Sequence, residues 1–175
     1  QNDTQAALTL AKQGQSHYPT QAFFYIVQAK ILRSRDDMQS AYRVLRTGLQ
    51  EMPDNVEILF QLGVIEYEQD RVQQAIQRME HIIDQDPDHA QALNFLGYTL
   101  VEQNTNLDRA RILIQRALSL DPENGYYLDS LAWYQYTVNH LEQAWETIQS
   151  AVALVTDDAI IWEHYADIAR ALDKK

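Results

Sequence analysis

The side chains in this sequence that are best suited to chemistry are its histidines and two close pairs of carboxylates. Most of the histidines fall at predicted turns or outer helices, and no two have the spacing of metal ligands; they are His17, His81, His89, His140 and His164. Asp36 with Asp37, and Glu66 with Glu68, are better explained by helix starts and solvated helix faces. The glycines are isolated, so no phosphate-binding loop is expected. The sequence therefore predicts a protein that is not an enzyme and that holds no cofactor and no metal.

The elements that must carry any site repeat along the chain with one period. The only prolines are Pro19, Pro53, Pro87 and Pro122, separated by 34, 34 and 35 residues. Thr156 stands where a fifth proline would fall. A period of this length predicts stacked helical repeats, which present an extended surface to other molecules.

Small residues keep the same phase as the prolines. Ten residues after each proline stand Ala29, Gly63, Gly97 and Ala132. Twelve residues before each proline position stand Ala7, Ala41, Ala75, Ala110 and Ala144. Small side chains at a fixed phase let two helices approach closely, so the pattern indicates helix pairs with a repeated close contact.

Together these positions resemble the tetratricopeptide repeat, a unit of two antiparallel helices with small residues at the contacts and proline at the closing turn. The resemblance covers almost the whole chain. It implies an all-α fold, a right-handed solenoid (superhelix) of about ten helices. The sequence departs from the pattern at Gln28, where leucine is expected, at Ile82, where a small residue is expected, and at Thr156.

The apolar spacing predicts one orphan second helix, four helix pairs and a final first helix. The expected ranges are 3–16, 21–34 with 37–50, 55–68 with 71–84, 89–103 with 107–119, 124–137 with 141–154, and 158–172. The predicted organisation is one array over 1–175, with repeats at about 22–55, 56–89, 90–124 and 125–158. The start of the chain within a repeat predicts a fragment of a longer array or a processed protein.

Two local predictions follow from the same register. Asp70 with Gln73 and Asn139 with Glu142 are predicted to be capping boxes at the starts of second helices. The last helix is predicted to turn Trp162, Tyr165 and Ile168 inward and to act as a cap.

In the family that the chain resembles, the first helices of successive units line a concave groove that binds ligands. Helical spacing places the residues 4, 7, 11 and 14 positions after each proline on that face. Tyrosine and tryptophan suit peptide binding, and Asn94 and Asp129 are expected to hydrogen-bond the backbone of an extended ligand. In the alternative interpretation these rings pack on one another as ordinary contacts between repeats. The predicted partner-binding residues are Phe60, Tyr67, Asn94, Tyr98, Tyr126, Asp129, Trp133 and Tyr136.

Some relatives hold the carboxylate terminus of chaperones in this groove, which requires several donors converging on one spot. Here Lys30 and Arg33 lie in one unit only, and the later units offer Glu57, Asp129, Glu163 and Asp167. Chaperone-tail binding is therefore not expected, and a basic or neutral polar ligand fits better.

Composition also excludes some classes of binding partner. The formal net charge of −11 argues against nucleic acid and against anionic membrane surfaces. No run of about 18 apolar residues is present, so no segment is expected to insert into a membrane. There are no cysteines, which excludes disulfides within the chain.

The segments 96–100 (LGYTL) and 128–133 (LDSLAW) resemble bacterial cell-envelope repeat proteins, several of them lipoproteins, that act as adaptors or assembly factors. This resemblance implies a periplasmic or envelope location. The predicted function is a scaffold that binds a partner segment in the groove. Two alternatives are a self-assembling module that associates through its N-terminal end, and a targeting or regulatory subunit of an enzyme such as an envelope protease.

Overall fold

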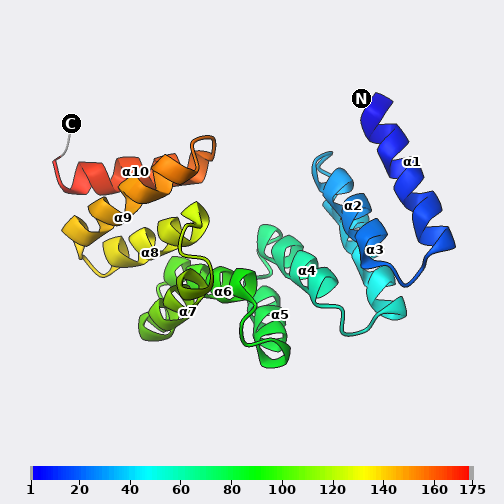
Figure 1. Ribbon diagram of the computed structural model, residues 1–175, viewed down its shortest axis with the longest axis horizontal. Coiled ribbons are helices and arrows are strands. Elements are labelled where there is room, and N and C mark those ends of the chain that lie inside the picture. The colour runs from blue at the N-terminus through cyan, green and yellow to red at the C-terminus, as the bar shows by residue number, and fades with distance from the viewer. Residues whose placement is uncertain (1, 174–175) are drawn as a thin grey trace. The chain divides into compact units, whose positions relative to one another are not determined.

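The computed structural model of the protein describes residues 2–173, which form helices and turns with no strand between them. The predicted all-α fold of antiparallel helix pairs is confirmed (Figure 1). The ten helices over this range are α1 (Asn2–His17), α2 (Ala22–Arg33), α3 (Met38–Glu51), α4 (Val56–Glu68), α5 (Val72–Gln85), α6 (Ala90–Glu102), α7 (Leu107–Leu120), α8 (Gly125–Thr137), α9 (Leu141–Leu154) and α10 (Ala159–Ala171).

The chain divides into two compact units, Gln1–Ile82 and Ile83–Lys175. We call α2, α4, α6, α8 and α10 the first helices, and α1, α3, α5, α7 and α9 the second helices. In the first unit α2 packs against α1, α3 and α4. In the second unit α8 packs against α6, α7, α9 and α10. Each helix thus buries its apolar side against near neighbours in sequence, while the single array over 1–175 remains a prediction.

Each first helix begins three residues after its proline position, and all of them except α2 are capped by the side chain of the preceding residue. Asn55 Oδ1 accepts a hydrogen bond from the Ile58 amide at 3.0 Å, and His89 Nδ1 accepts one from the Ala92 amide at 3.1 Å. Asp158 caps α10 in the same way, through the Ile160 amide at 2.9 Å. These side chains satisfy amides that have no partner within the helix.

Two or three residues after the end of each first helix lies a residue in the left-handed conformation. The residues with positive φ at these ends are Asp36, Asp70, Asn104, Asn139 and Asp173, again 34 or 35 residues apart. After α8, the Asn139 amide donates to the Tyr136 carbonyl at 2.9 Å and the His140 amide donates to the Gln135 carbonyl at 2.8 Å. This pair of bonds is a Schellman motif, which turns the chain back along the helix that it has just left.

This geometry corrects the prediction of capping boxes at Asp70 and Asn139. Their φ angles are 60° and 61°, so each lies outside the second helix and closes the first one. Neither residue is the N-cap of the helix that follows, because α5 begins at Val72 and α9 begins at Leu141. Asp and Asn occur here because their short polar side chains tolerate the left-handed region better than other non-glycine residues do.

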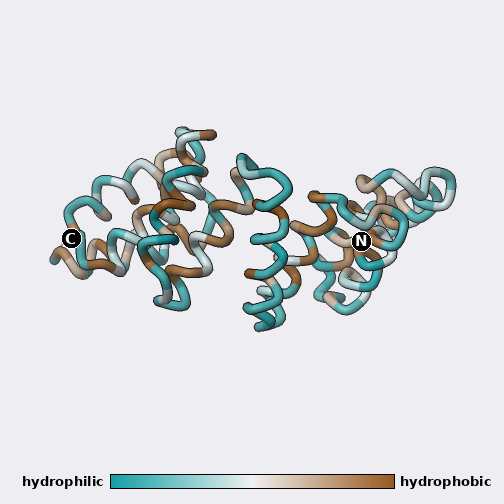
Figure 2. The backbone as a smooth tube through the Cα atoms, turned by 90° about the horizontal axis from the view of Figure 1, so that it is seen from below, coloured by the Kyte–Doolittle hydropathy of each residue, from teal (hydrophilic) through white to brown (hydrophobic). Residues whose placement is uncertain are grey.

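The core consists of the repeated small residues and the larger apolar residues around them. The alanines twelve positions before the proline points, Ala41, Ala75, Ala110 and Ala144, are all fully buried. At Gly97 a Cβ atom would lie 2.6 Å from Ile114 Cγ1 and 3.1 Å from the Ala110 carbonyl oxygen, so α6 and α7 approach too closely for any side chain there. Figure 2 shows apolar and hydrophilic stretches alternating along single helices, as expected when one side of each helix is buried.

The last helix only partly follows its prediction. Ile168 is fully buried and Tyr165 is half-buried, but Trp162 is 44% exposed. The Trp162 ring lies edge-on to Tyr165, and its Nε1–H donates to the Thr156 carbonyl at 3.0 Å. The prediction that Trp162 points inward is therefore wrong, because its ring packs only at the edge of the helix contact, against Tyr165.

The left-handed turn gives a stability prediction. Replacing Asn139 with valine should lower the free energy of unfolding by about 1–2 kcal/mol, because a β-branched side chain is strained at positive φ. Asn139→Gly is the matched control and should keep or raise stability. Urea unfolding followed by circular dichroism measures both, and equal midpoints for the two variants would contradict the turn assignment.

Candidate interaction surface

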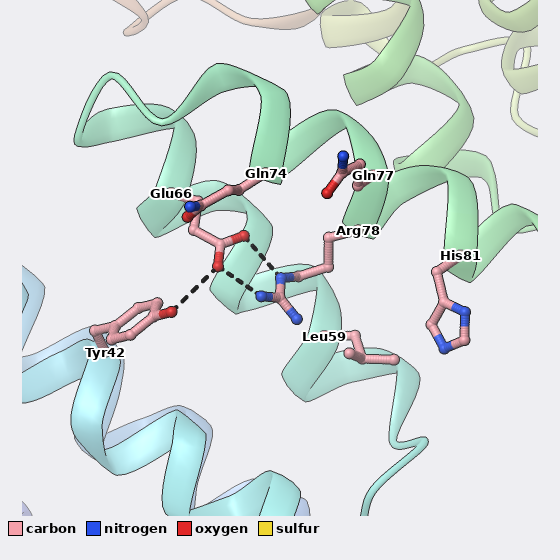
Figure 3. Close-up of a pocket in the computed structure, with 7 residues that line it drawn as sticks. All are labelled: Tyr42, Leu59, Glu66, Gln74, Gln77, Arg78 and His81. Carbon is pink, nitrogen blue, oxygen red and sulfur yellow. Dashed lines mark hydrogen bonds and ion pairs between the residues drawn. The ribbon is translucent and has the colours of Figure 1, made fainter.

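The first unit contains a cavity of about 350 Å³ beside a buried ion pair (Figure 3). The Glu66 carboxylate on α4 is fully buried and accepts a hydrogen bond from Arg78 Nε on α5 at 2.7 Å. The Tyr42 hydroxyl on α3 donates to the same carboxylate at 3.4 Å. The hydrogen bonds with Glu66 raise the pKa of Arg78. Because the Arg78 guanidinium is already paired with Glu66, the cluster links α3, α4 and α5 and leaves no unpaired guanidinium to bind a ligand.

The predicted partner-binding residues all lie on first helices. Phe60 and Tyr67 are half-buried on α4 in the first unit. The other six lie in the second unit, on α6 (Asn94 and Tyr98) and on α8 (Tyr126, Asp129, Trp133 and Tyr136). Since α8 contacts both α6 and α10, side chains from three first helices meet in this unit.

A cluster of rings forms where these three helices meet. We call Tyr98, Trp133, Tyr136 and His164 the ring cluster. The Trp133 ring stacks on Tyr136, at 4.9 Å between ring centroids and 19° between planes, and on His164, at 4.1 Å and 13°. The Tyr98 ring lies 6.2 Å from His164. Two stacking contacts restrict the orientation of the Trp133 ring.

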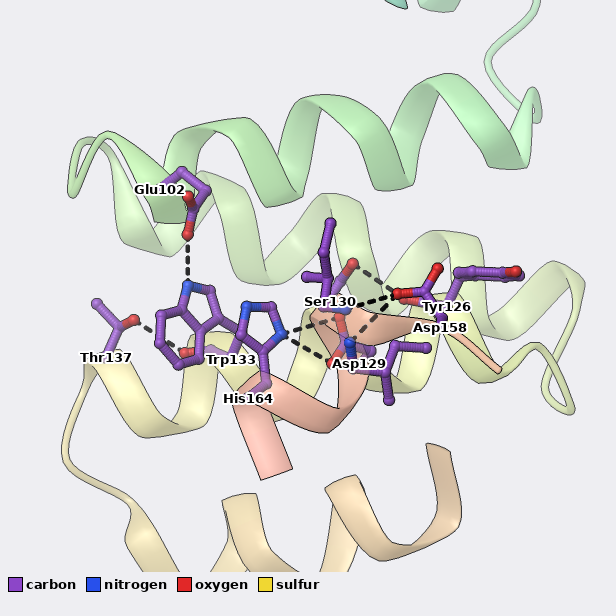
Figure 4. A network of polar contacts seen from close by, with 10 residues as sticks. Glu102, Tyr126, Asp129, Ser130, Trp133, Thr137, Asp158 and His164 are labelled. Carbon is purple, nitrogen blue, oxygen red and sulfur yellow. Dashed lines mark hydrogen bonds and ion pairs between the residues drawn. The ribbon is translucent and has the colours of Figure 1, made fainter. Parts of the chain in front are cut away.

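Polar contacts hold the ring cluster at its edges (Figure 4). Trp133 Nε1–H donates to Glu102 Oε1 at 2.6 Å. His164 Nδ1 lies 2.9 Å and 3.1 Å from the two oxygens of Asp129, and it donates because an ionised carboxylate can only accept. Asp129 and His164 are both buried. A buried carboxylate needs such a partner, so the Asp129–His164 pair joins α8 to α10.

The predicted residues of the second unit therefore differ in their contacts and in their exposure to solvent. Tyr98, Trp133 and Tyr136 are brought together, while Asp129 lies beneath them with its carboxylate directed at His164. Tyr126 is 53% exposed on the first turn of α8. Asn94 is half-buried, and among the described residues its Oδ1 has no hydrogen-bond partner.

His164 is the residue that sequence reasoning missed. The sequence pattern gives His164 no role beyond that of the other histidines. In the structure it is buried on the first helix α10, 35 residues after Asp129. That separation is one repeat period. The sequence therefore contained a signal for the pair, because an acidic residue and a histidine occupy nearly equal positions of successive first helices. Over residues 2–173 no three His, Cys, Asp or Glu side chains converge as metal ligands would.

Charge around the ring cluster is mainly acidic. Glu102 and Glu163 are exposed. Asp167 on α10 is half-buried and accepts a hydrogen bond from Arg170 at 3.0 Å. In the first unit Arg33 is paired with Glu68, so this guanidinium already has a carboxylate partner.

Comparison with known proteins identifies a protein family whose model matches this chain. The family described as "Tetratricopeptide repeat" matches residues 32–97 and 66–134. The chain is 29% identical over 153 residues to the TPR repeat-containing protein PA4667 of Pseudomonas aeruginosa, covering 87% of this chain and 26% of that protein. It therefore spans about a quarter of the length of this curated relative.

Solved structures share the fold. The protein pilF of Pseudomonas aeruginosa has a TM-score of 0.78 at 17% identity, over 98% of this chain and 78% of that one. A chain of the APC/C hetero-tetramer Cut9–Hcn1 has a TM-score of 0.84 at 14% identity, over 97% of this chain and 34% of that one. Within the region that the structure describes, no helix combines the length and the apolar character needed to cross a bilayer.

The buried pair in the first unit gives a second prediction. Arg78→Met should lower the free energy of unfolding by about 3 kcal/mol, because Glu66 would keep a buried charge without its partner. The double variant Glu66→Leu/Arg78→Met should recover most of that loss. Urea midpoints of the two variants and the parent chain test this, and a double variant no more stable than Arg78→Met would contradict it.

The Asp129–His164 pair gives a third prediction. Asp129→Ala should cost about 1–3 kcal/mol, because the buried His164 N–H would lose its acceptor. Asp129→Asn keeps an acceptor oxygen and should cost less. Thermal unfolding of both variants is the measurement, and an Asp129→Ala variant as stable as the parent would show that the pair does not hold α10 to α8.

Proposed function

Because this chain belongs to the tetratricopeptide repeat family, we propose that it is a protein-binding scaffold that holds a segment of a partner protein against its first helices. Proteins of this family bind other proteins. The observation that carries the proposal is the stacking of Trp133 with Tyr136 and His164, together with Tyr126, which is 53% exposed seven residues earlier and so lies on the same side of α8. In the second unit, the residues proposed to contact the partner are Asn94, Tyr98, Tyr126, Trp133 and Tyr136, with Asp129 holding His164 against Trp133. In the first unit, taken by itself, they are Phe60 and Tyr67.

Rigidity favours the ring cluster as a binding surface. Trp133 is held by stacking on Tyr136 and His164 and by its hydrogen bond to Glu102, so little side-chain entropy remains to be lost when a partner binds. Tyrosine and tryptophan also give a large contact area with a polar tip, which is why they dominate binding energy at many interfaces.

The charge at this surface indicates the chemistry of the partner segment. Glu102 and Glu163 are exposed acceptors, and the chain carries a net charge of −11. Arg33, one of the two groove cations in the first unit, is already paired with Glu68. A neutral polar or basic segment is therefore favoured over an acidic one or a free carboxylate terminus.

The resemblance of segments 96–100 and 128–133 to cell-envelope repeat proteins makes a bacterial envelope the first setting in which to look for the partner. An adaptor or assembly factor there would bring the bound protein to a second one. A targeting or regulatory subunit of an enzyme, such as an envelope protease, would use the same surface.

A fourth prediction tests this function. The double variant Tyr98→Ala/Tyr126→Ala should lose at least about tenfold in affinity for the partner, equivalent to ~1.4 kcal/mol, because two contact residues of the surface are truncated. Partners are captured from a lysate of the source cell on the immobilised chain and identified by mass spectrometry. Binding of each purified partner is then measured by calorimetry.

Tyr18→Ala is the matched control, because Tyr18 is 60% exposed and lies outside the helices. It should bind as the parent chain does. Equal binding of a captured partner by the parent chain and by Tyr98→Ala/Tyr126→Ala would move the site away from the first helices.

A further inference from the structure

We propose that the second unit contains a binding site, separate from the ring cluster, for an uncharged primary carboxamide such as the side chain of Asn or Gln in a partner protein. The site is a cavity between α7, α8 and α9, and Gln135 is the residue that recognises the ligand. The proposal does not depend on partner binding at the ring cluster.

The cavity has a volume of about 310 Å³ and lies within the second unit. Three helices line it, through Leu131, Tyr134 and Gln135 of α8, Asp108 and Arg111 of α7, and His140 at the start of α9. The two charged residues and the histidine are exposed, so a ligand can enter from solvent on the side of the second helices.

Gln135 brings an unsatisfied polar atom to this cavity. Its Oε1 atom is buried, and among the described residues it has no hydrogen-bond partner. A buried acceptor without a donor is unfavourable, so a ligand that donates a hydrogen bond to it removes that cost on binding. The same side chain carries an amide N–H2 group, which offers the ligand a donor as well.

The repeat pattern shows what occupies the equivalent place in the first unit. Gln135 and Glu66 both stand thirteen residues after a proline. Glu66 accepts a hydrogen bond from Arg78 Nε at 2.7 Å (Figure 3), but the position equivalent to Arg78 in the second unit is Thr147. The Thr147 hydroxyl donates to a carbonyl of its own helix at 2.9 Å. The second unit therefore lacks the long donor that the first unit supplies from its own chain.

Charge restricts the kind of ligand that can replace this donor. Gln135 is neutral where Glu66 is charged, so a guanidinium or ammonium group would be desolvated there without a counter-charge. Asp108 and Arg111 have opposite charges, so together they favour neither a cation nor an anion. A carboxylate has no hydrogen to donate to Gln135 Oε1. The cavity therefore favours a neutral group that is both a donor and an acceptor.

A primary carboxamide meets this requirement. Its N–H donates to Gln135 Oε1 while its carbonyl oxygen accepts from the Gln135 amide, so two parallel hydrogen bonds join the side chains. Leu131 and Tyr134 offer apolar area to the aliphatic part of the bound side chain. In a partner protein the group is the side chain of Asn or Gln.

The experiment titrates the ¹⁵N-labelled 175-residue chain with capped amino acids and follows amide resonances by NMR. Capped glutamine carries the carboxamide, capped glutamate a carboxylate of the same shape, capped arginine a cation and capped methionine an apolar chain. We expect capped glutamine to shift the Gln135 side-chain amide resonances in a saturable way. The other three should bind at least about tenfold more weakly, equivalent to ~1.4 kcal/mol, because each leaves Gln135 Oε1 unpaired or buries a charge.

Gln135→Leu is the variant that removes the site. The repeat accepts leucine at this position, because Leu100 stands at the equivalent place of α6 and is buried. The variant should lose the binding of capped glutamine, followed through the backbone amide of Tyr134, and its spectrum identifies the Gln135 side-chain resonances by their loss. Gln149→Leu is the matched control and should bind as the parent chain does, because Gln149 is exposed on α9 outside the cavity.

Three results would overturn the proposal. One is a parent chain whose Gln135 resonances do not respond to capped glutamine. Another is equal or tighter binding of the capped glutamate, arginine or methionine by the parent chain, because the recognised group would then not be a carboxamide. The third is binding of capped glutamine that persists in Gln135→Leu. Partner capture at the ring cluster, tested through Tyr98→Ala/Tyr126→Ala, is unaffected by all of these outcomes.

Discussion

Close approach between neighbouring helices is the constraint on which the rest of this structure depends. Fully buried alanines on the second helices face glycine or alanine on the first helices, and at Gly97 the gap leaves no room even for a methyl group. The larger apolar residues around these points can then interdigitate. Since the helices are covered by near neighbours in sequence, apolar burial accumulates pair by pair.

Two kinds of turn alternate between the helices, and each has its own chemistry. In the turns that follow α3 and α5, a proline is followed two residues later by a capping side chain, Asn55 or His89. The turn that follows a first helix needs positive φ, and an Asp or Asn supplies it. Because the two turns demand different residues, a first helix cannot exchange places with a second helix in the fold.

The buried polar groups add specificity at particular places. Glu66 with Arg78, and Asp129 with His164, each join a first helix to a neighbour through a carboxylate that is out of contact with water. Buried pairs contribute little net stability, but breaking one is costly, so they disfavour helices packed in another register. In the second unit this constraint also positions the ring cluster, because His164 is both the partner of Asp129 and one stacking face of Trp133. The proposed binding surface therefore depends on a contact that a partner never touches.

The sequence by itself determined the repeat period, the ten helices to within a few residues, the small residues of the close contacts and the family. These features are local or recur at a fixed spacing, so they can be read without knowing which side chains meet. Tertiary structure decided the rest. It placed Asp129 and His164 in one buried pair, assigned Asp70 and Asn139 to left-handed turns, and left Trp162 exposed. Each of these outcomes depends on what a neighbouring helix covers or fails to cover, and helical periodicity along one segment does not contain that information.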